Sequence, residues 1–377
     1  MTIRLVLAFS LLALSSCRLD VRTPELSEAT FGGGPCVMVT TAEFGVDGAL
    51  ARVSPDTLGV DDGVTTVHHD TRVVRIGDDA WALERLGADA IRGLDGALAT
   101  RWTRTLESGA NPADASARGG RVLVSLPGSD ALALLSLDGE ELGREGLSAF
   151  ADDDGASEPD RVLATQSAWW VTLQRLESFR CSEASPLLVR VGDDGRVDEA
   201  RSITLPACNP VDAALLDDER ALVALAGVYR SLAPQLGVPV EDDGGLALVD
   251  LTTGSAELIF RESDLDGDVS AVVTDGARAW LLVSDDAFMT RLVGVDLLAR
   301  SVIFETHLDG GAFDLLPVDD DVWVASRSIT APGVYAFDAA SGEPTAGPMR
   351  TLLPPYELLP LPSCVDGPES RTAASLP

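Results

Sequence analysis

Lysine is entirely missing from this chain of 377 residues. All 28 basic residues are arginine, and they face 60 acidic residues, which gives a formal net charge of −32. Without lysine there can be no Walker A loop and no Schiff-base lysine. The sequence also has no G-x-S-x-G, H-E-x-x-H or C-x-x-C motif. Because a surface this acidic repels phosphate backbones, we expect no nucleic-acid partner.

Asparagine is nearly missing, and its two occurrences share one context. Asn111 and Asn209 both begin the pentapeptide Asn-Pro-x-Asp-Ala, and each leads into an apolar segment. Asparagine caps turns by bonding backbone amides two or three residues further on, and the proline after it fixes φ. We therefore expect both asparagines to cap turns where strands begin.

The longest apolar run at the N-terminus is too short to cross a bilayer as a helix. Residues 1–16 join one arginine, the run LVLAFSLLAL and small residues before Cys17, which is the plan of a signal peptide. The ending Leu-Ser-Ser-Cys resembles the bacterial lipobox. That resemblance implies removal of residues 1–16, a lipid on Cys17 that anchors the protein to a membrane, and a flexible linker over residues 17–35. Arg18 stands where inner-membrane lipoproteins of enteric bacteria carry Asp, which favours the outer membrane.

The rest of the chain repeats short apolar runs between Gly and Asp turns, which are typical of β-hairpins. One position in the second strand of each unit recurs at intervals of 43, 42, 47, 52, 58 and 43 residues. These positions are Met38, Trp81, Leu123, Trp170, Leu222, Trp280 and Trp323. A base period near 42 residues is typical of a four-stranded propeller blade. The sequence predicts an all-β fold, a seven-bladed β-propeller of four-stranded blades over residues 36–364, with a disordered tail at 365–377.

The first unit lacks its innermost strand, and the segment YELLPLPSC near the C-terminus reads as the missing one. We expect this C-terminal strand to complete the N-terminal blade and close the ring. Four cysteines remain after Cys17, an even number that suggests disulfides in an exported protein. The register of the repeat pairs them as Cys36–Cys364 and Cys181–Cys208.

The blade pattern and the Asn-Pro-x-Asp lead-in resemble bacterial surface propellers of the YVTN and lactonase-like kind. The resemblance covers residues 36 to 364, and propellers of this kind host both binding and catalysis. We expect a non-catalytic binding or scaffold module of the cell envelope, monomeric, whose partner is an unidentified envelope protein or glycan. The alternative is a metal-dependent lactonase-like hydrolase or lyase in the central channel. Asn111 and Asn209 could then supply ligands to a divalent metal.

Two insertions lengthen the loops between second and third strands in blades four and five, at residues 176–185 and 228–245. Both should rise on one face and form a continuous rim. Aromatic and arginine side chains are enriched at interface hot spots. We therefore predict a binding rim made of Phe179, Arg180, Tyr229, Arg230 and Gln235.

Two further patterns suggest cations but have simpler explanations. His69, Asp70, His307 and Asp309 fall at blade connections on one face and could hold a metal. Turn-forming aspartates account for this pattern without one, so we predict no metal and no cofactor. The segment SDLDGDVS (263–270) has the aspartates of a calcium loop but not its spacing, and we expect a solvated turn.

Overall fold

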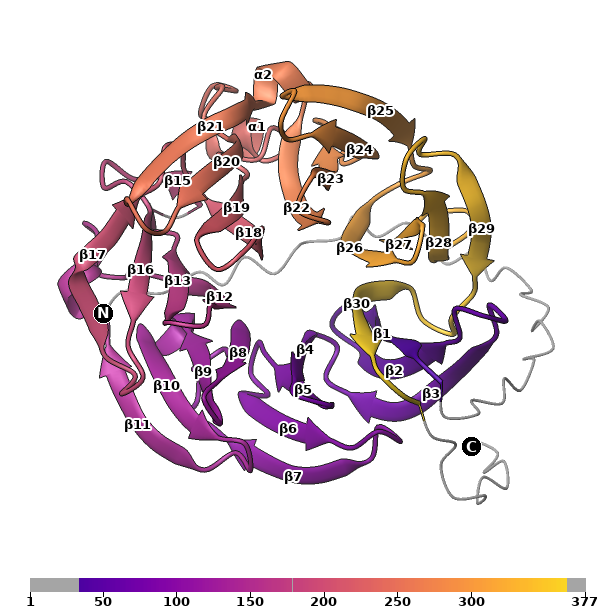
Figure 1. Cartoon of the computed structure of the whole chain (residues 1–377), viewed down its shortest axis with the longest axis horizontal. Helices are drawn as coiled ribbons and strands as arrows, with labels where there is room; N and C mark the ends of the chain where they lie inside the picture. The colour runs from indigo at the N-terminus through magenta and orange to yellow at the C-terminus, as the bar shows by residue number, and fades with distance from the viewer. Residues whose placement is uncertain (1–33, 178, 365–377) are drawn as a thin grey trace.

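The computed structural model describes residues 34–177 and 179–364, and it confirms the predicted fold. Seven four-stranded antiparallel sheets stand around a central axis as the blades of a propeller (Figure 1). The predicted signal peptide, Cys17, most of the linker and the C-terminal tail lie outside these residues. No helix among the described residues combines the length and apolar content needed to span a bilayer.

Each blade is a meander that runs from the axis outwards. Blade one contains β30 (Pro355–Leu361), β1 (Cys36–Glu43), β2 (Asp47–Val53) and β3 (Val60–Val67). Blade two contains β4 (Thr71–Ile76), β5 (Asp79–Glu84), β6 (Ala90–Leu94) and β7 (Thr100–Thr105). Blade three contains β8 (Asp114–Arg118), β9 (Arg121–Leu126), β10 (Ala131–Ser136) and β11 (Glu141–Gly146).

The remaining blades follow the same order. Blade four contains β12 (Pro159–Ala164), β13 (Trp169–Leu173), β16 (Leu187–Val191) and β17 (Val197–Thr204). Blade five contains β18 (Pro210–Leu215), β19 (Arg220–Leu225), β20 (Gly245–Asp250) and β21 (Ser255–Arg261). Blade six contains β22 (Asp268–Thr274), β23 (Arg278–Ser284), β24 (Thr290–Asp296) and β25 (Ser301–His307). Blade seven contains β26 (Ala312–Val318), β27 (Asp321–Ser326), β28 (Gly333–Asp338) and β29 (Pro344–Met349).

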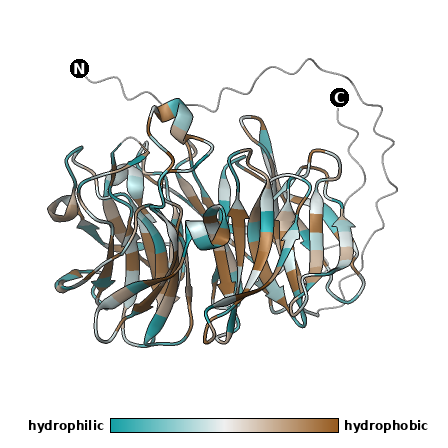
Figure 2. Ribbon diagram, turned by 90° about the horizontal axis from the view of Figure 1, so that it is seen from above, coloured by the Kyte–Doolittle hydropathy of each residue, from teal (hydrophilic) through white to brown (hydrophobic). Residues whose placement is uncertain are grey.

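The core lies between neighbouring blades rather than at the axis. Second strands such as β9, β13 and β19 are covered on both faces, because each blade is packed against a blade on either side. Outer strands such as β11 instead alternate between exposed and half-buried residues, as expected of an antiparallel strand with one face exposed to solvent. Brown apolar segments accordingly follow the strands in Figure 2. The repeated tryptophans, for example Trp81 and Trp323, are buried in these interfaces, which confirms their predicted place in the core.

The C-terminal strand closes the ring as predicted. β30 is hydrogen-bonded to β1, so the innermost strand of the first blade comes from the far end of the chain. The predicted disulfide between Cys36 and Cys364 joins the two ends, with the Cα atoms 5.8 Å apart. In the chain-entropy model a covalent loop this long contributes at most roughly 5–6 kcal/mol to the free energy of unfolding.

The propeller has two distinct faces. We call the upper face the one that carries the loops between second and third strands and the connections between blades. Both insertions rise there: the first contains the short hairpin β14 (Leu176–Glu177) and β15 (Arg180–Cys181), the second the helix α1 (Ala233–Leu236). The start of β1 and the end of β30 lie on the opposite, lower face, because β1 runs upward from Cys36 and β30 runs downward to Leu361.

Candidate functional site

The axis of the propeller holds a small, strongly charged cavity. It has a volume of about 120 Å³ and is lined mainly by the innermost strands of the blades. Its charged lining includes Arg72, Asp160, Arg161, Asp212, Asp314 and Glu357. Ligand sites for small organic molecules usually measure about 300–1,000 Å³, so this channel is too narrow for such a substrate.

Carboxylates around the axis bond four of the innermost strands to the next blade. In each case one carboxylate oxygen accepts a hydrogen bond from a backbone N–H of the following blade. The pairs are Asp114 with Val162 (2.8 Å), Asp212 with Val272 (2.9 Å), Asp314 with Leu358 (2.7 Å) and Glu357 with Val73 (2.8 Å). These side chains therefore hold neighbouring blades together. This role explains why several innermost strands carry an acidic residue at the same position in the strand.

Arginines offset part of the negative charge. The Nε atom of Arg72 lies 3.4 Å from Asp114 and 3.8 Å from Glu357. Burial nevertheless dominates over the attraction of Arg72, and it raises the pKa of Asp160 and of Glu357 to about 7 and that of Asp212 to about 6. Around neutral pH these groups can exchange protons, which bears on the stability of the ring.

The two asparagines occupy strained backbone positions at blade connections. Asn111 has φ of 52° and Asn209 has φ of 56°, in the left-handed region where asparagine is enriched over other non-glycine residues. Oδ1 of Asn111 accepts from the N–H of Leu86 (3.1 Å), and Nδ2 of Asn209 donates to the carbonyl of Gly227 (2.9 Å). The prediction of local capping is therefore wrong: both side chains reach a neighbouring loop, and the left-handed backbone explains the choice of residue.

The histidine and aspartate pairs at the blade connections do not meet. Asp70 accepts a hydrogen bond from Arg85 (2.6 Å), and Asp309 accepts from Ser328 (3.1 Å) in a different loop. His69 belongs to the connection between blades one and two, whereas His307 ends β25 in blade six. Where the structure places side chains, three metal-ligating groups converge only at Cys181, Cys208 and Asp243, and those two sulfurs are bonded to each other.

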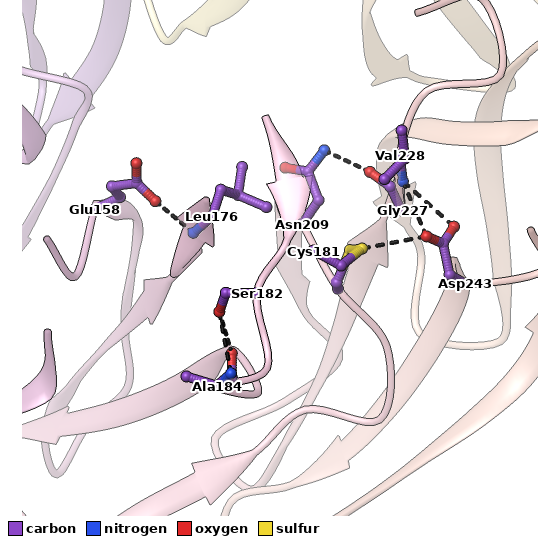
Figure 3. The surroundings of a disulfide bond; sticks show 10 residues. Glu158, Leu176, Cys181, Ser182, Ala184, Asn209, Gly227, Val228 and Asp243 are labelled. Atoms are coloured by element: carbon purple, nitrogen blue, oxygen red, sulfur yellow. Dashed lines mark hydrogen bonds between the residues drawn. A yellow bond between two sulfur atoms is a disulfide. The ribbon is translucent and has the colours of Figure 1, made fainter. Parts of the chain in front are cut away.

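The two insertions on the upper face form one unit. The predicted disulfide between Cys181 and Cys208 ties the first insertion to the connection between blades four and five, with the Cα atoms 5.7 Å apart. The guanidinium of Arg180 donates to the carbonyl of Leu236 in the second insertion. Figure 3 shows Asp243 of the second insertion directed toward this disulfide.

A pocket of about 360 Å³ opens beside the disulfide, which is three times the volume of the axial cavity. Its walls come from the first insertion, the connection between blades four and five, the second insertion and β21. Lining residues include Cys181, Pro206, Cys208, Asp242, Leu258 and Arg261. The mixture of apolar surface with the carboxylates of Asp242 and Asp243 and the guanidinium of Arg261 suits a ligand that has both apolar and polar parts.

The five residues of the predicted rim divide into two groups. Phe179 is 60% exposed, and Arg180 and Gln235 are also exposed. Tyr229 is half-buried, and burial together with the negative charges of Asp268 and Asp160 raises the pKa of its hydroxyl.

Arg230 is half-buried as well and is held by Asp268, with 3.2 Å between Nε and Oδ1. Sequence reasoning missed the pocket walls Asp242 and Arg261 because turn-like Asp runs and strand ends give no sign of what they enclose. The exposed part of the rim is therefore smaller than the sequence suggested and lies beside the pocket.

Comparison with known proteins supports the fold. No protein-family model matches the chain, and no curated protein matches it. A candidate 6-phosphogluconolactonase from Bacteroides fragilis is similar over 89% of this chain and 99% of its own, with a TM-score of 0.62 and 13% identity. A catalytically inactive virginiamycin B lyase from Staphylococcus aureus, solved with quinupristin, is similar over 78% of this chain and 92% of its own, with a TM-score of 0.53 and 11% identity. At these identities the likeness extends to the fold alone: the chain is a seven-bladed β-propeller of the shape that these lactonase-like and lyase structures share.

Proposed function

We propose that the protein is a non-catalytic binding propeller of the bacterial cell envelope, anchored through a lipid on Cys17. Its recognition surface is the exposed part of the rim, Phe179, Arg180 and Gln235, together with the adjoining 360 Å³ pocket. The observation that carries the proposal is that the first insertion is fixed twice, by the disulfide to the connection between blades four and five and by the bond from Arg180 to Leu236 of the second insertion. A pre-organised surface loses less conformational entropy when it binds a partner.

The chemistry of the exposed rim favours a protein partner over a glycan. Phenylalanine and arginine are enriched in protein–protein interfaces, and Phe179 stands out from an otherwise acidic chain. Loops on a rigid scaffold are also the segments on which recognition most often develops.

The direction of the chain supports the same assignment. The linker from Cys17 leads to Cys36, which begins β1 on the lower face, whereas the rim lies on the upper face. The N-terminal segment therefore enters the propeller on the face opposite the rim.

The enzymatic alternative has less support in the channel. Asp212, Asp314 and Glu357 already accept backbone N–H groups from neighbouring blades. The amides of Asn111 and Asn209 are engaged at two separate blade connections. These carboxylates and amides therefore already have a structural role in joining neighbouring blades and loops.

The proposal is tested by affinity capture of partners from solubilised envelopes. The protein with Phe179→Ala and Arg180→Glu should lose its specific partner, because removal of a hot-spot residue typically costs about 2 kcal/mol or more of binding free energy. The control is Arg220→Glu, which reverses an exposed charge of the neighbouring blade on the lower face. Phe179→Ala alone should weaken capture without touching the bond to Leu236.

Three outcomes are informative. Loss of one protein with the rim variants and its retention with Arg220→Glu supports the proposal. If the rim variants lose a captured glycan rather than a protein, the rim remains the recognition surface but its partner is a glycan. Capture by the rim variants that equals capture by the wild-type protein, with the Cys181–Cys208 disulfide intact, would contradict the proposal.

A further inference from the structure

A buried glutamate beneath the second insertion has no partner for its charge. Glu262 follows β21 and begins the short helix α2 (Glu262–Leu265). Its side chain is 0% exposed, and neither carboxylate oxygen has a hydrogen-bond partner. Buried polar groups are almost always hydrogen-bonded, and an isolated buried carboxylate is costly. Something must therefore neutralise Glu262.

Two glycines leave room for oxygen atoms around this carboxylate. A Cβ atom added to Gly244 would clash with both Oε1 of Glu262 and the carbonyl oxygen of Leu225. A Cβ atom added to Gly227 would clash with Oδ1 of Asp243 and would lie 3.1 Å from Oε1 of Glu262. Oxygens from three separate segments thus gather around the two glycines: the end of β19, the end of the second insertion and the start of α2.

Asp243 is also poorly satisfied. Its two oxygens share one long contact with the N–H of Val228, at 3.3 Å each. Oδ2 also lies 3.1 Å from Sγ of Cys181 (Figure 3). Because Cys181 is in a disulfide, its sulfur carries no proton and cannot donate a hydrogen bond. The carboxylate of Asp243 can therefore still bind a cation on the side that faces Glu262.

Arg230, whose positive charge acts on Glu262, is already engaged with another carboxylate. The backbone N–H of Arg230 donates to Oδ2 of Asp268 (2.7 Å), and its Nε atom lies 3.2 Å from Oδ1. Asp268 is 1% exposed, so the prediction of a solvated turn at 263–270 is wrong for this residue. Arg230 balances Asp268 and leaves the charges of Glu262 and Asp243 without a matching cation among the described side chains that surround them.

We propose that Glu262, Asp243 and the carbonyl oxygen of Leu225 form a binding site for a calcium ion. Carboxylate and carbonyl oxygens are the ligands that calcium prefers, and its coordination tolerates irregular geometry. Calcium takes six to eight oxygens, so waters would complete its coordination, whereas magnesium is less suitable because it demands near-ideal octahedral geometry. The ion would join β19, the second insertion and α2, and it would fix the base of the insertion whatever the rim binds.

The competing state of the site is protonation of Glu262. Burial, together with the negative charges of Asp268, Asp243 and Asp242, raises the pKa of Glu262 to about 8 against the opposing effect of Arg230. Calcium and the proton then compete for the same oxygens. Calcium affinity should therefore be weaker in acidic solution, where the carboxylates are protonated.

The test is calorimetric titration of the full-length, chelator-treated protein with calcium chloride. The wild-type protein should bind one calcium ion per chain, with a dissociation constant of about 1 mM or tighter, and should bind magnesium more weakly. Glu262→Gln, which keeps the shape of the side chain, should lose at least about tenfold in calcium affinity. Glu241→Gln is the matched control, since Glu241 is an exposed carboxylate in the same insertion and should bind as wild type does.

Asp243→Asn serves as a second variant if Glu262→Gln does not fold, and the same loss of affinity is expected of it. Absence of calcium binding by the folded wild-type protein at several times about 1 mM would overturn the proposal. So would wild-type affinity in a folded Glu262→Gln protein, or a loss in Glu241→Gln as large as that in the site variants. Neither result depends on whether the rim binds a partner.

Discussion

Removal of the ring-closing disulfide should cost more stability than removal of the disulfide on the rim. Cys36 and Cys364 are 328 residues apart, whereas Cys181 and Cys208 are 27 apart. In the chain-entropy model these loops contribute at most roughly 5–6 and 3–4 kcal/mol, respectively, because a longer loop restricts the unfolded chain more. Replacing each pair by serines should therefore give a difference of about 2 kcal/mol between the two variants.

The native ring should survive the loss of the disulfide. β30 remains hydrogen-bonded to β1, and Leu358 and Leu361 remain buried in the interfaces on either side of blade one. Urea unfolding, followed by tryptophan fluorescence, gives the two free-energy losses, and hydrogen exchange over 355–361 reports whether the strand stays paired. A smaller loss for the Cys36 and Cys364 variant, with β30 still protected, would refute the reasoning from loop length.

Three further predictions follow from sequence and structure. Cys17→Ala should release the protein from the membrane fraction, and a variant that stays membrane-bound after normal processing would contradict the lipid anchor. Burial raises the pKa of Asp160 and Glu357 to about 7, so the folded state binds protons more tightly than the unfolded chain. The free energy of unfolding should therefore fall as pH rises from about 4 to 7, and Asp160→Asn should flatten this dependence in pH-resolved urea titrations; an unchanged slope would exclude Asp160 as a source. Trp323→Ala should cost about 3–5 kcal/mol, because Trp323 is buried between blades seven and one, and an unfolding midpoint equal to that of the wild-type protein would argue against that packing.

The architecture was predictable because it repeats. The seven apolar positions from Met38 to Trp323, which recur with a base period near 42 residues, mark the same buried strand in successive blades, and this repeat fixes which strands are neighbours. Both disulfides followed from that register, since Cys36 and Cys364 flank the strands β1 and β30 that pair. The local sequence pattern was sufficient to predict those parts of the fold that depend on contacts between adjacent hairpins.

Side-chain direction in the long insertions was not predictable in the same way. Tyr229 and Arg230 have the composition of an exposed interface, yet both are half-buried, and Asp268 holds Arg230 inward. Glu262 reads as a surface residue at the end of a strand but is fully buried by a loop that starts 34 residues earlier in the sequence, at 228. Contacts of this kind depend on distant segments, and a single sequence carries no periodic signal for them.

Site-specific photo-crosslinking tests the central claim most directly. A photoreactive residue at Phe179 samples the upper face beside the pocket, and one at Asp217 samples an exposed turn on the lower face of the neighbouring blade. In intact cells that carry the lipid-anchored protein, we expect a specific crosslinked protein from position 179 and none from position 217. Crosslinks from position 217 alone, or the same products from both positions, would contradict a recognition surface on the rim.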